Sequence, residues 1–380
     1  MVRSTAHIAG CGEAAYSRHA PPGTTTAQLL ADAAAGAVEN ANLKAADLDG
    51  LAVSSFSLGP DHAIDLAWRL GLHLRWLMED TNGGASGINM LQHARRAVEA
   101  GDASCVLVLA GDHLPRERFQ ALVDNYNVAT SEDLAPLGFG GPNSLFAMLT
   151  QRHAGANDLE PADYGALVIA QRQWAAHNPG AVYREPLDLD RYLSAPIVAE
   201  PLRIFDCVPV VSGADALIVT SAAAGAHPPV EVRSLELSFN HDDQQGDGLQ
   251  SGLAGVASKL WREAEAGPAD MDVTMVYDDY PAMALVQLAD LGYGNGDLAQ
   301  LIHEQIETRR LALNTSGGQL SAGQAGAAGG LHGLVEAVRQ LRGEADGRQV
   351  ADARVALVAG YGMVCYRYGA CAGAAVLART

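Results

Sequence analysis

The chain has 380 residues, 48% of them hydrophobic and 18% charged, so it can bury a large core as one large fold or as two to three domain-sized units. Its 25 basic and 44 acidic residues give a formal net charge of −19, which repels nucleic acids and anionic membrane surfaces and makes both poor partners. The most apolar stretch, residues 105–110, is too short to span a bilayer. Five scattered cysteines without a Cys-x-x-Cys pair argue against a structural zinc site and favour a reducing, cytoplasmic location.

Helices and strands alternate in the first part of the chain. Apolar residues at helical spacing predict a helix over 26–41, and residues 50–55 are typical of a short strand. A turn of small residues at 82–87 precedes a predicted helix over 88–100. Residues 105–110 are wholly apolar, as in a strand buried on both faces. The pattern predicts an α/β protein.

The middle of the chain departs from this alternation. From residue 111 to about 203 it has scattered Pro and Gly and more polar helices, and a buried strand resumes over 206–219. We therefore expect an N-terminal half made of residues 1–115 and 204–225, an inserted loop domain over 116–203, and a C-terminal half over 226–380.

The second half repeats the plan of the first. Small residues at 326–330 precede a predicted helix, and the apolar strand 355–360 follows a polar turn. The same succession of small-residue turn, helix and buried strand ending in glycine occurs over 84–111. Helix followed by parallel strand, twice over, predicts two similar βαβ halves packed side by side.

Several stretches resemble the thiolase superfamily. The run Asn314-Thr-Ser-Gly-Gly-Gln-Leu-Ser-Ala-Gly-Gln324 is similar to the C-terminal signature of sterol-carrier-protein-type thiolases. Val276-Tyr-Asp-Asp-Tyr280 resembles the H-D-C-F box of that branch, and Asp80-Thr-Asn-Gly-Gly-Ala-Ser-Gly87 lies where thiolases carry the nucleophile box. The resemblance implies a five-layered αβαβα fold made of two similar halves plus a loop domain, usually a homodimer, that acts on a CoA thioester. It also implies that two helix N-termini meet at the site, where their N–H groups stabilise an oxyanion.

The residues that carry thiolase chemistry are replaced. The family's nucleophilic Cys corresponds to Gly84, so the acyl-enzyme route lacks its nucleophile. Its two His positions read Tyr277 and Gln324, and Val358 or Ala359 stands where the second Cys is expected. Such losses fit either a non-catalytic subunit or a reaction that needs no acyl-enzyme.

Tyr277 favours the second reading, because a phenol beside an oxyanion hole can act as acid or base. Residues 83–87, Tyr277-Asp278 and Gly360-Tyr-Gly-Met363 resemble a thiolase-like branch, the steroid side-chain aldolases. The resemblance implies retro-aldol cleavage of a β-hydroxyacyl-CoA and a small zinc-ribbon/OB-fold partner protein. The chain departs from that branch at Gln324, where a second Tyr is expected, since Gln donates hydrogen bonds but cannot take a proton.

The resulting hypothesis gives each group a role. Tyr277 removes the β-hydroxyl proton and returns one to Cα, and N–H groups around Gly84 and Gly362, with Gln324, hold the thioester enolate. Gly84 should also leave room for a tertiary alcohol carbon. We expect no metal and no tightly bound cofactor, with the CoA thioester as substrate. The residues predicted to bind that substrate are Asn314, Ser86, Tyr361 and His241.

Two alternatives stay open. One is a thiolase-type acyltransferase with an unconventional nucleophile such as Cys365 or Ser86, and the other is an acyl-CoA- or lipid-binding subunit without turnover. Cys105 and Cys207 are interpreted as inert core thiols, and Tyr280 as a packing residue.

Overall fold

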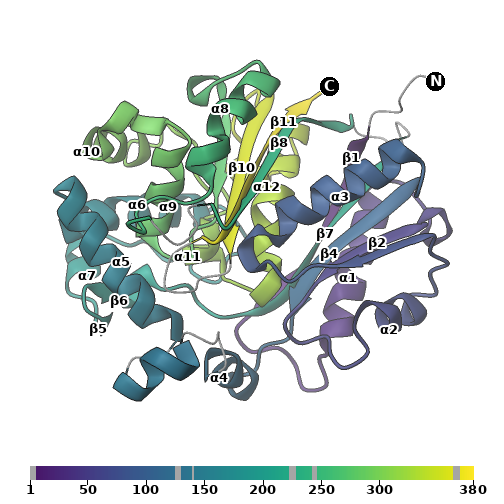
Figure 1. Cartoon of the computed structure of the whole chain (residues 1–380), viewed down its shortest axis with the longest axis horizontal. Coiled ribbons are helices and arrows are strands. Elements are labelled where there is room, and N and C mark those ends of the chain that lie inside the picture. Colours follow the sequence, from purple (N-terminus) through teal and green to yellow (C-terminus); the bar gives the residue numbers. More distant parts are fainter. Residues whose placement is uncertain (1–5, 125–129, 139–140, 222–227, 242–245, 363–368) are drawn as a thin grey trace.

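The computed structural model describes residues 6–124, 130–138, 141–221, 228–241, 246–362 and 369–380. Its centre is a nine-stranded mixed sheet (Figure 1). In spatial order the strands are β3 (Trp76–Glu79), β2 (Gly50–Ser54), β4 (Cys105–Asp112), β7 (Ser212–Thr220), β1 (His7–Ser17), β8 (Val230–Phe239), β11 (Cys371–Arg379), β10 (Val355–Gly362) and β9 (Val273–Val276).

The predicted duplication is visible in the strand pairing. In the N-terminal half β2 and β4 are parallel, and β4–β7 and β7–β1 are antiparallel. In the C-terminal half β9 and β10 are parallel, and β10–β11 and β11–β8 are antiparallel. The half-sheets join through β1 and β8, which pair at only His7–Glu231 and Ile8–Val230.

Helices complete the five layers that the resemblance implied. The central pair, α3 (Ser86–Ala100) and α12 (Gly329–Arg342), shares one apolar cluster with strands of both halves. Outside the N-terminal half lie α1 (Thr26–Asn40) and α2 (His62–Arg69), and outside the C-terminal half lie α8 (Leu253–Ala264) and α9 (Pro281–Asp290) (Figure 1). The order is therefore helices, sheet, helices, sheet, helices, and the fold prediction is confirmed.

Local chemistry sets the ends of these elements. The Thr25 hydroxyl accepts a hydrogen bond from the Gln28 N–H and so caps α1, which ends within a residue of its predicted end. Both central helices stop at a left-handed glycine, Gly101 (φ 83°) after α3 and Gly343 (φ 75°) after α12. The strand predicted to start at residue 206 begins only at Ser212, because Asp206 ends a 3₁₀ turn and the backbone of Pro209 and Val211 pairs with Gln324.

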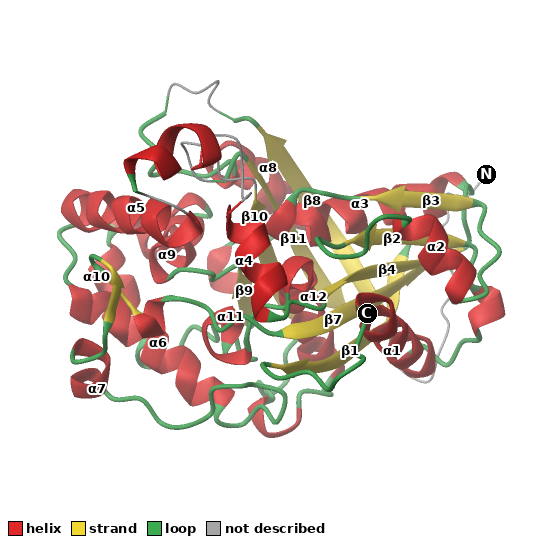
Figure 2. Ribbon diagram, turned by 90° about the horizontal axis from the view of Figure 1, so that it is seen from below, coloured by secondary structure: helices red, strands yellow, loops and turns green. Residues whose placement is uncertain are grey.

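The segment predicted as a loop domain lies outside the nine-stranded sheet (Figures 1 and 2). It holds α4 (Arg116–Asp124), α5 (Gly141–Asn157), α6 (Pro161–Ala175), α7 (Leu189–Leu193) and the small sheet of β5 (Ile197–Ala199) and β6 (Leu202–Arg203). Two further short helices are α10 (Leu298–Gln300) and α11 (Gly318–Ala322). The domain boundaries themselves stay predictions.

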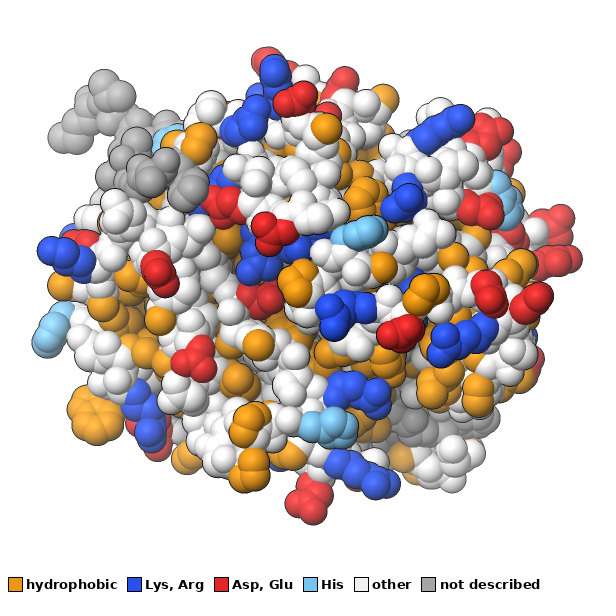
Figure 3. All heavy atoms as spheres, turned by 180° about the vertical axis from the view of Figure 1, so that it is seen from behind, with side chains coloured by type: hydrophobic (Ala, Val, Ile, Leu, Met, Phe, Trp, Pro, Cys, Tyr) orange, Lys and Arg blue, Asp and Glu red, His pale blue; other side chains and the backbone are white. Residues whose placement is uncertain are grey.

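The surface carries the excess of acidic residues without a single segregated face in the view of Figure 3, where red and blue side chains are interspersed. Every helix in the described part of the chain is too short or too polar to cross a membrane.

Candidate active site

A cavity of about 540 Å³ opens where the two halves meet the inserted segment. Its polar side chains come mainly from the C-terminal half, whereas most of its apolar wall comes from the N-terminal half and the inserted segment. The lining residues are Phe56, Thr81, Gly83, Gly84, Leu114, Phe119, Gln120, Leu122, Val123, Gly141, Pro142, Asn143, Cys207, Val208, Val210, Tyr277, Asp279, Tyr280, Gln324, Gly326, Tyr361 and Gly362.

The two central helices begin beside this cavity. Each is preceded by a single 3₁₀ turn of small residues, Gly83–Ala85 before α3 and Gly326–Ala328 before α12. A Cβ on Gly87 would lie 1.8 Å from the carbonyl oxygen of Gly330, so only glycine lets the two helix starts touch. Two helix N-termini, each with positive dipole and N–H groups, thus border one cavity, as predicted.

Tyr277 directly follows β9 and contributes its ring to the cavity wall. The Gln324 Nε2 donates a hydrogen bond to the Tyr277 hydroxyl oxygen over 2.7 Å. Donation to a phenol oxygen stabilises its negatively charged form, so the pair suits a phenol that takes up a proton. The sequence hypothesis gave Gln324 the role of holding the enolate, whereas in this structure its amide donates a hydrogen bond to the Tyr277 hydroxyl.

The ring of Tyr277 lies where a side chain at position 84 would project. A Cβ on Gly84 would lie 2.4 Å from Cε2 of the Tyr277 ring and 2.3 Å from the Tyr361 carbonyl oxygen. The expectation that Gly84 leaves room for a substrate carbon is therefore wrong, since the phenol ring fills that room. Instead, the missing side chain at 84 is what allows the ring of Tyr277 to lie against the start of α3.

A second phenol stands beside the first. The rings of Tyr277 and Tyr361 meet edge to face, with centroids 5.3 Å apart and an interplanar angle of 81°. The Tyr361 hydroxyl donates to Oδ1 of Asp279, which also lines the cavity. Burial raises the pKa of Asp279 to about 8; the Tyr361 hydrogen bond opposes this shift, and the neighbouring Asp278 carboxylate adds to it.

Backbone contacts hold Tyr277 in place. The Asn314 side chain accepts from the Val276 N–H (2.9 Å) and donates to the Val276 carbonyl (3.1 Å). Gln287 Nε2 donates to the carbonyl oxygen of Tyr277 itself over 2.7 Å. Asn314, predicted to touch the substrate, is only 3% exposed and lies behind the phenol, because both ends of its amide pair with the strand. It fixes the strand end from which Tyr277 projects.

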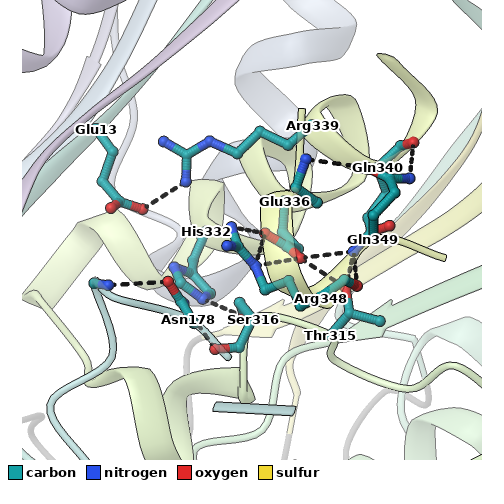
Figure 4. Close-up of polar contacts among 12 residues, drawn as sticks. Glu13, Asn178, Thr315, Ser316, His332, Glu336, Arg339, Gln340, Arg348 and Gln349 are labelled. Atoms are coloured by element: carbon teal, nitrogen blue, oxygen red, sulfur yellow. Dashed lines mark hydrogen bonds and ion pairs between the residues drawn. The ribbon is translucent and has the colours of Figure 1, made fainter. Parts of the chain in front are cut away.

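A buried polar network supports the turn that carries Asn314 (Figure 4). Glu336 and Arg348 form an ion pair of 2.8 Å, and the Thr315 hydroxyl donates to Glu336 over 2.7 Å. Next to it, His332 Nε2 and the Ser316 hydroxyl are 2.7 Å apart. The turn is therefore tied to α12, which begins at the cavity.

Two predicted substrate contacts lie elsewhere. Ser86 is fully buried and donates to Asp80, because its position at the start of α3 turns it toward the segment that follows β3. His241 lines a different cavity, together with His153 and Val286, and not the one that holds Tyr277. Gly362 does border the Tyr277 cavity, but its N–H donates a hydrogen bond to the Cys371 sulfur. Burial outweighs this bond and raises the pKa of Cys371 to about 12.

Asp279 and Cys207 are among the cavity residues that sequence reasoning did not assign to the site. Asp279 lies two residues after Tyr277 and lines the same cavity, whereas the adjacent Asp278 does not. Cys207 was interpreted as a core thiol but lines the cavity. Burial, with Asp206 and Asp279 nearby, raises its pKa to about 12, so it remains an unreactive thiol. Cys365 lies outside the described residues.

One group of metal-ligand side chains lies away from the cavity. Ligand atoms of Glu13, Asp215 and His332 come within 4.8 Å of one another, where β1, β7 and α12 meet. Arg339 Nη1 already stands 3.3 Å from Glu13, and the Tyr16 hydroxyl donates to Asp215 over 2.7 Å. A guanidinium in that position disfavours a bound cation.

Comparison with known proteins agrees with this architecture. Residues 238–375 match the family model described as thiolase C-terminal domain-like. The chain is 31% identical over 387 residues to 17-hydroxy-3-oxo-4-pregnene-20-carboxyl-CoA lyase of Mycobacterium tuberculosis, with 96% of this chain and 98% of that protein covered. It is 27% identical over 385 residues to the steroid side-chain-cleaving aldolase of Thermomonospora curvata, with 96% and 97% covered.

A solved structure described as Ltp2-ChsH2(DUF35) aldolase superposes with a TM-score of 0.85 at 25% identity, covering 100% of this chain and 99% of that one. Fold, motifs and full-length similarity thus agree, and the chain belongs to the thiolase superfamily, in its sterol-carrier-protein-type branch of thiolase-like proteins.

Proposed function

We propose that this chain is a carbon–carbon lyase that cleaves a β-hydroxyacyl-CoA by a retro-aldol reaction. The observation that carries the proposal is the ring of Tyr277, which fills the space beside Gly84 where the family's nucleophile would project. A site that has Gly84 in place of the nucleophilic Cys, and a phenol hydrogen-bonded to Gln324, is suited to proton transfer and not to acyl transfer. The names of the full-length relatives, a lyase and an aldolase, support the same reaction class.

The chemistry follows from the groups at the cavity. Tyr277, as phenolate, takes the proton of the β-hydroxyl, the Cα–Cβ bond breaks, and the electron pair moves into the thioester to form an enolate. N–H groups at the two helix starts, near Gly84 and Gly326, stabilise the developing negative charge. The CoA thioester is in this scheme the substrate, and no resident cofactor is required.

An apolar acyl group fits the other wall of the cavity. Phe56, Phe119 and Val123 line it from the N-terminal half and the inserted segment. Burial of such surface contributes about 25 cal/mol per Å² to binding, which favours a large hydrophobic side chain. We infer a steroid or branched acyl group, in keeping with the relative that acts on a pregnene carboxyl-CoA.

Replacing Tyr277 with Phe tests the function. We expect cleavage of a β-hydroxyacyl-CoA to fall at least about 100-fold, because the ring remains and only the proton acceptor is lost. Tyr293→Phe is the matched control, since it removes a buried hydroxyl that bonds to Thr274 outside the cavity. Full activity in Tyr277→Phe would refute the assignment.

The acyltransferase alternative lacks a suitable nucleophile among the described residues. Ser86 is buried against Asp80, and burial keeps Cys207 protonated. Intact-protein mass spectrometry after incubation with acyl-CoA would reveal a covalent acyl-enzyme and would favour transfer over cleavage. Measured turnover of any β-hydroxyacyl-CoA would exclude the non-catalytic alternative.

Two partners are proposed. The solved structure named above is described with a DUF35 protein, which supports a partner of that type for this chain; that this partner is a zinc-ribbon/OB-fold protein stays a prediction. A second copy of the chain is inferred from β3, which stands at the sheet edge beside α2 (Figure 2). On this side Ile64 and Trp68 are 67% and 77% exposed, and two identical edges can pair about a twofold axis.

A further inference from the structure

The cavity holds a second pair of polar groups that the scheme above does not use. The Tyr361 hydroxyl donates to Asp279, and both residues line the cavity together with Tyr277. Tyr361 is only 2% exposed, and its ring is held edge to face against both Tyr277 and Phe146. Tyr361 is therefore fixed in ring contact with the first phenol, with centroids 5.3 Å apart, and it carries the bond to Asp279.

The two pairs have opposite hydrogen-bond polarity. Tyr277 receives a proton donor from Gln324, which favours its phenolate. Tyr361, in contrast, donates a hydrogen bond to a carboxyl oxygen of Asp279, so its own hydroxyl stays protonated. One side of the cavity is thus arranged to accept a proton, and the other side is arranged to hold one.

Asp279 is the group on that second side whose proton can leave. Burial and the adjacent Asp278 raise its pKa to about 8, so most of its population is protonated at neutral pH. The titratable groups around it include Tyr361, Asp278 and Cys207, and Tyr277 and Tyr280 line the same cavity. Asp278 accepts the N–H groups of Gln319 and Leu320 and points away from the cavity, and the Cys207 thiol is neutral.

We propose that Asp279, held by Tyr361, is the acid that protonates Cα of the enolate, and that Tyr277 serves only the β-hydroxyl. This assignment rests on the retro-aldol function proposed above and replaces the expectation that Tyr277 performs both transfers. Tyr361 is a positioning residue.

The proton balance of the cycle is complete. The β-hydroxyl proton passes to the Tyr277 oxygen, and the O–H electron pair becomes the new carbonyl bond as Cα–Cβ breaks. The enolate carbon then takes the proton of Asp279, which is left as a carboxylate. After the products leave, solvent removes the proton from Tyr277 and returns one to Asp279, so no redox partner is needed.

The reverse of the second step can be measured alone. By microscopic reversibility, the Asp279 carboxylate removes an α-proton from an acyl-CoA product, which exchanges hydrogen for deuterium in D₂O. The probes are acetyl-CoA and propionyl-CoA, incubated with the chain with and without its DUF35-type partner, and exchange is followed by mass spectrometry. We expect Asp279→Asn to slow exchange at least about 100-fold and Tyr277→Phe to slow it less than about 5-fold.

Asn keeps an acceptor for the Tyr361 hydroxyl, and equal melting temperatures of the variants and the wild type check the fold. A further readout is pH, because exchange needs the carboxylate and should rise through pH 8, whereas cleavage needs the acid and should fall there. Retention of exchange in Asp279→Asn, its loss in Tyr277→Phe, or cleavage by a wild type that shows no exchange would each overturn the proposal. Exchange that requires Asp279 in a chain that cleaves no β-hydroxyacyl-CoA would instead refute only the lyase function.

Discussion

Gly84→Ala is the sharpest test of how the phenol replaced the nucleophile. The new Cβ would stand 2.4 Å from Cε2 of Tyr277 and 2.3 Å from the Tyr361 carbonyl oxygen, against about 3.5–4.0 Å for an ordinary carbon contact. The carbonyl belongs to β10 within the sheet, so the ring of Tyr277 has to move by more than about 1 Å. We expect a cost of about 1–3 kcal/mol in unfolding free energy and a loss of about 100-fold in kcat/KM.

Urea unfolding and steady-state cleavage measure the two effects. Gly255→Ala is the matched control, because this helical glycine in α8 has no atom within 4 Å of the new Cβ and the change should stabilise by up to about 1 kcal/mol. Adding Gly84→Ala to Tyr277→Ala should cost less than adding it to the wild type, with a coupling of about 0.5–3 kcal/mol. If Gly84→Ala costs the same unfolding free energy in the wild type and in Tyr277→Ala, the ring of Tyr277 does not fill the position of the new Cβ.

Three further results are expected. Trp68→Glu should convert a dimer into a monomer in light scattering after size exclusion, and an unchanged mass would show that this face is not the interface. Burial raises the pKa of Asp278 from 3.8 to about 7. The folded chain therefore keeps this proton to a higher pH than the unfolded chain does, and the free energy of unfolding falls as the pH rises from 4 to 7. Asp278→Asn should reduce the slope of the urea-unfolding free energy against pH over that range by at most about 1.4 kcal/mol per pH unit. Glu336→Gln leaves the charge of the buried Arg348 unpaired and should cost about 3–5 kcal/mol in urea unfolding. Glu99→Gln, which breaks a half-buried pair with Arg95 on the surface of α3, should cost less than about 1 kcal/mol, and similar costs would contradict the argument.

Much of the fold follows from the sequence because its signals are local. Helical spacing located α1 to within one residue, and the repeated order of turn, helix and strand anticipated the matching strand pairing of the two halves. The motifs also brought Gly84, Tyr277 and Gln324 into one cavity, since family motifs mark positions that converge in space.

What the sequence left open depends on side-chain direction and on long-range contact. Asn314 is polar and stands in a signature motif, yet whether its amide meets substrate or backbone is decided by the strand that passes beside it. The Ser86 hydroxyl bonds to Asp80 although Ser86 lies just two residues from Gly84, and His241 lines another cavity. Asp278 and Asp279 are adjacent and chemically identical, yet Asp279 lines the cavity and Asp278 does not.

The origin of the cavity walls has a consequence for the way such a protein diversifies. The proton-handling residues project from the C-terminal half, near the two helix starts, where a Cβ on Gly87 would lie 1.8 Å from the Gly330 carbonyl oxygen, while the hydrophobic wall around Phe119 and Val123 belongs to a separate stretch of chain. Selection or engineering can therefore reshape that stretch to admit different acyl groups and leave the bond-breaking apparatus untouched. Variation in substrate among related chains should accordingly be concentrated in the inserted segment.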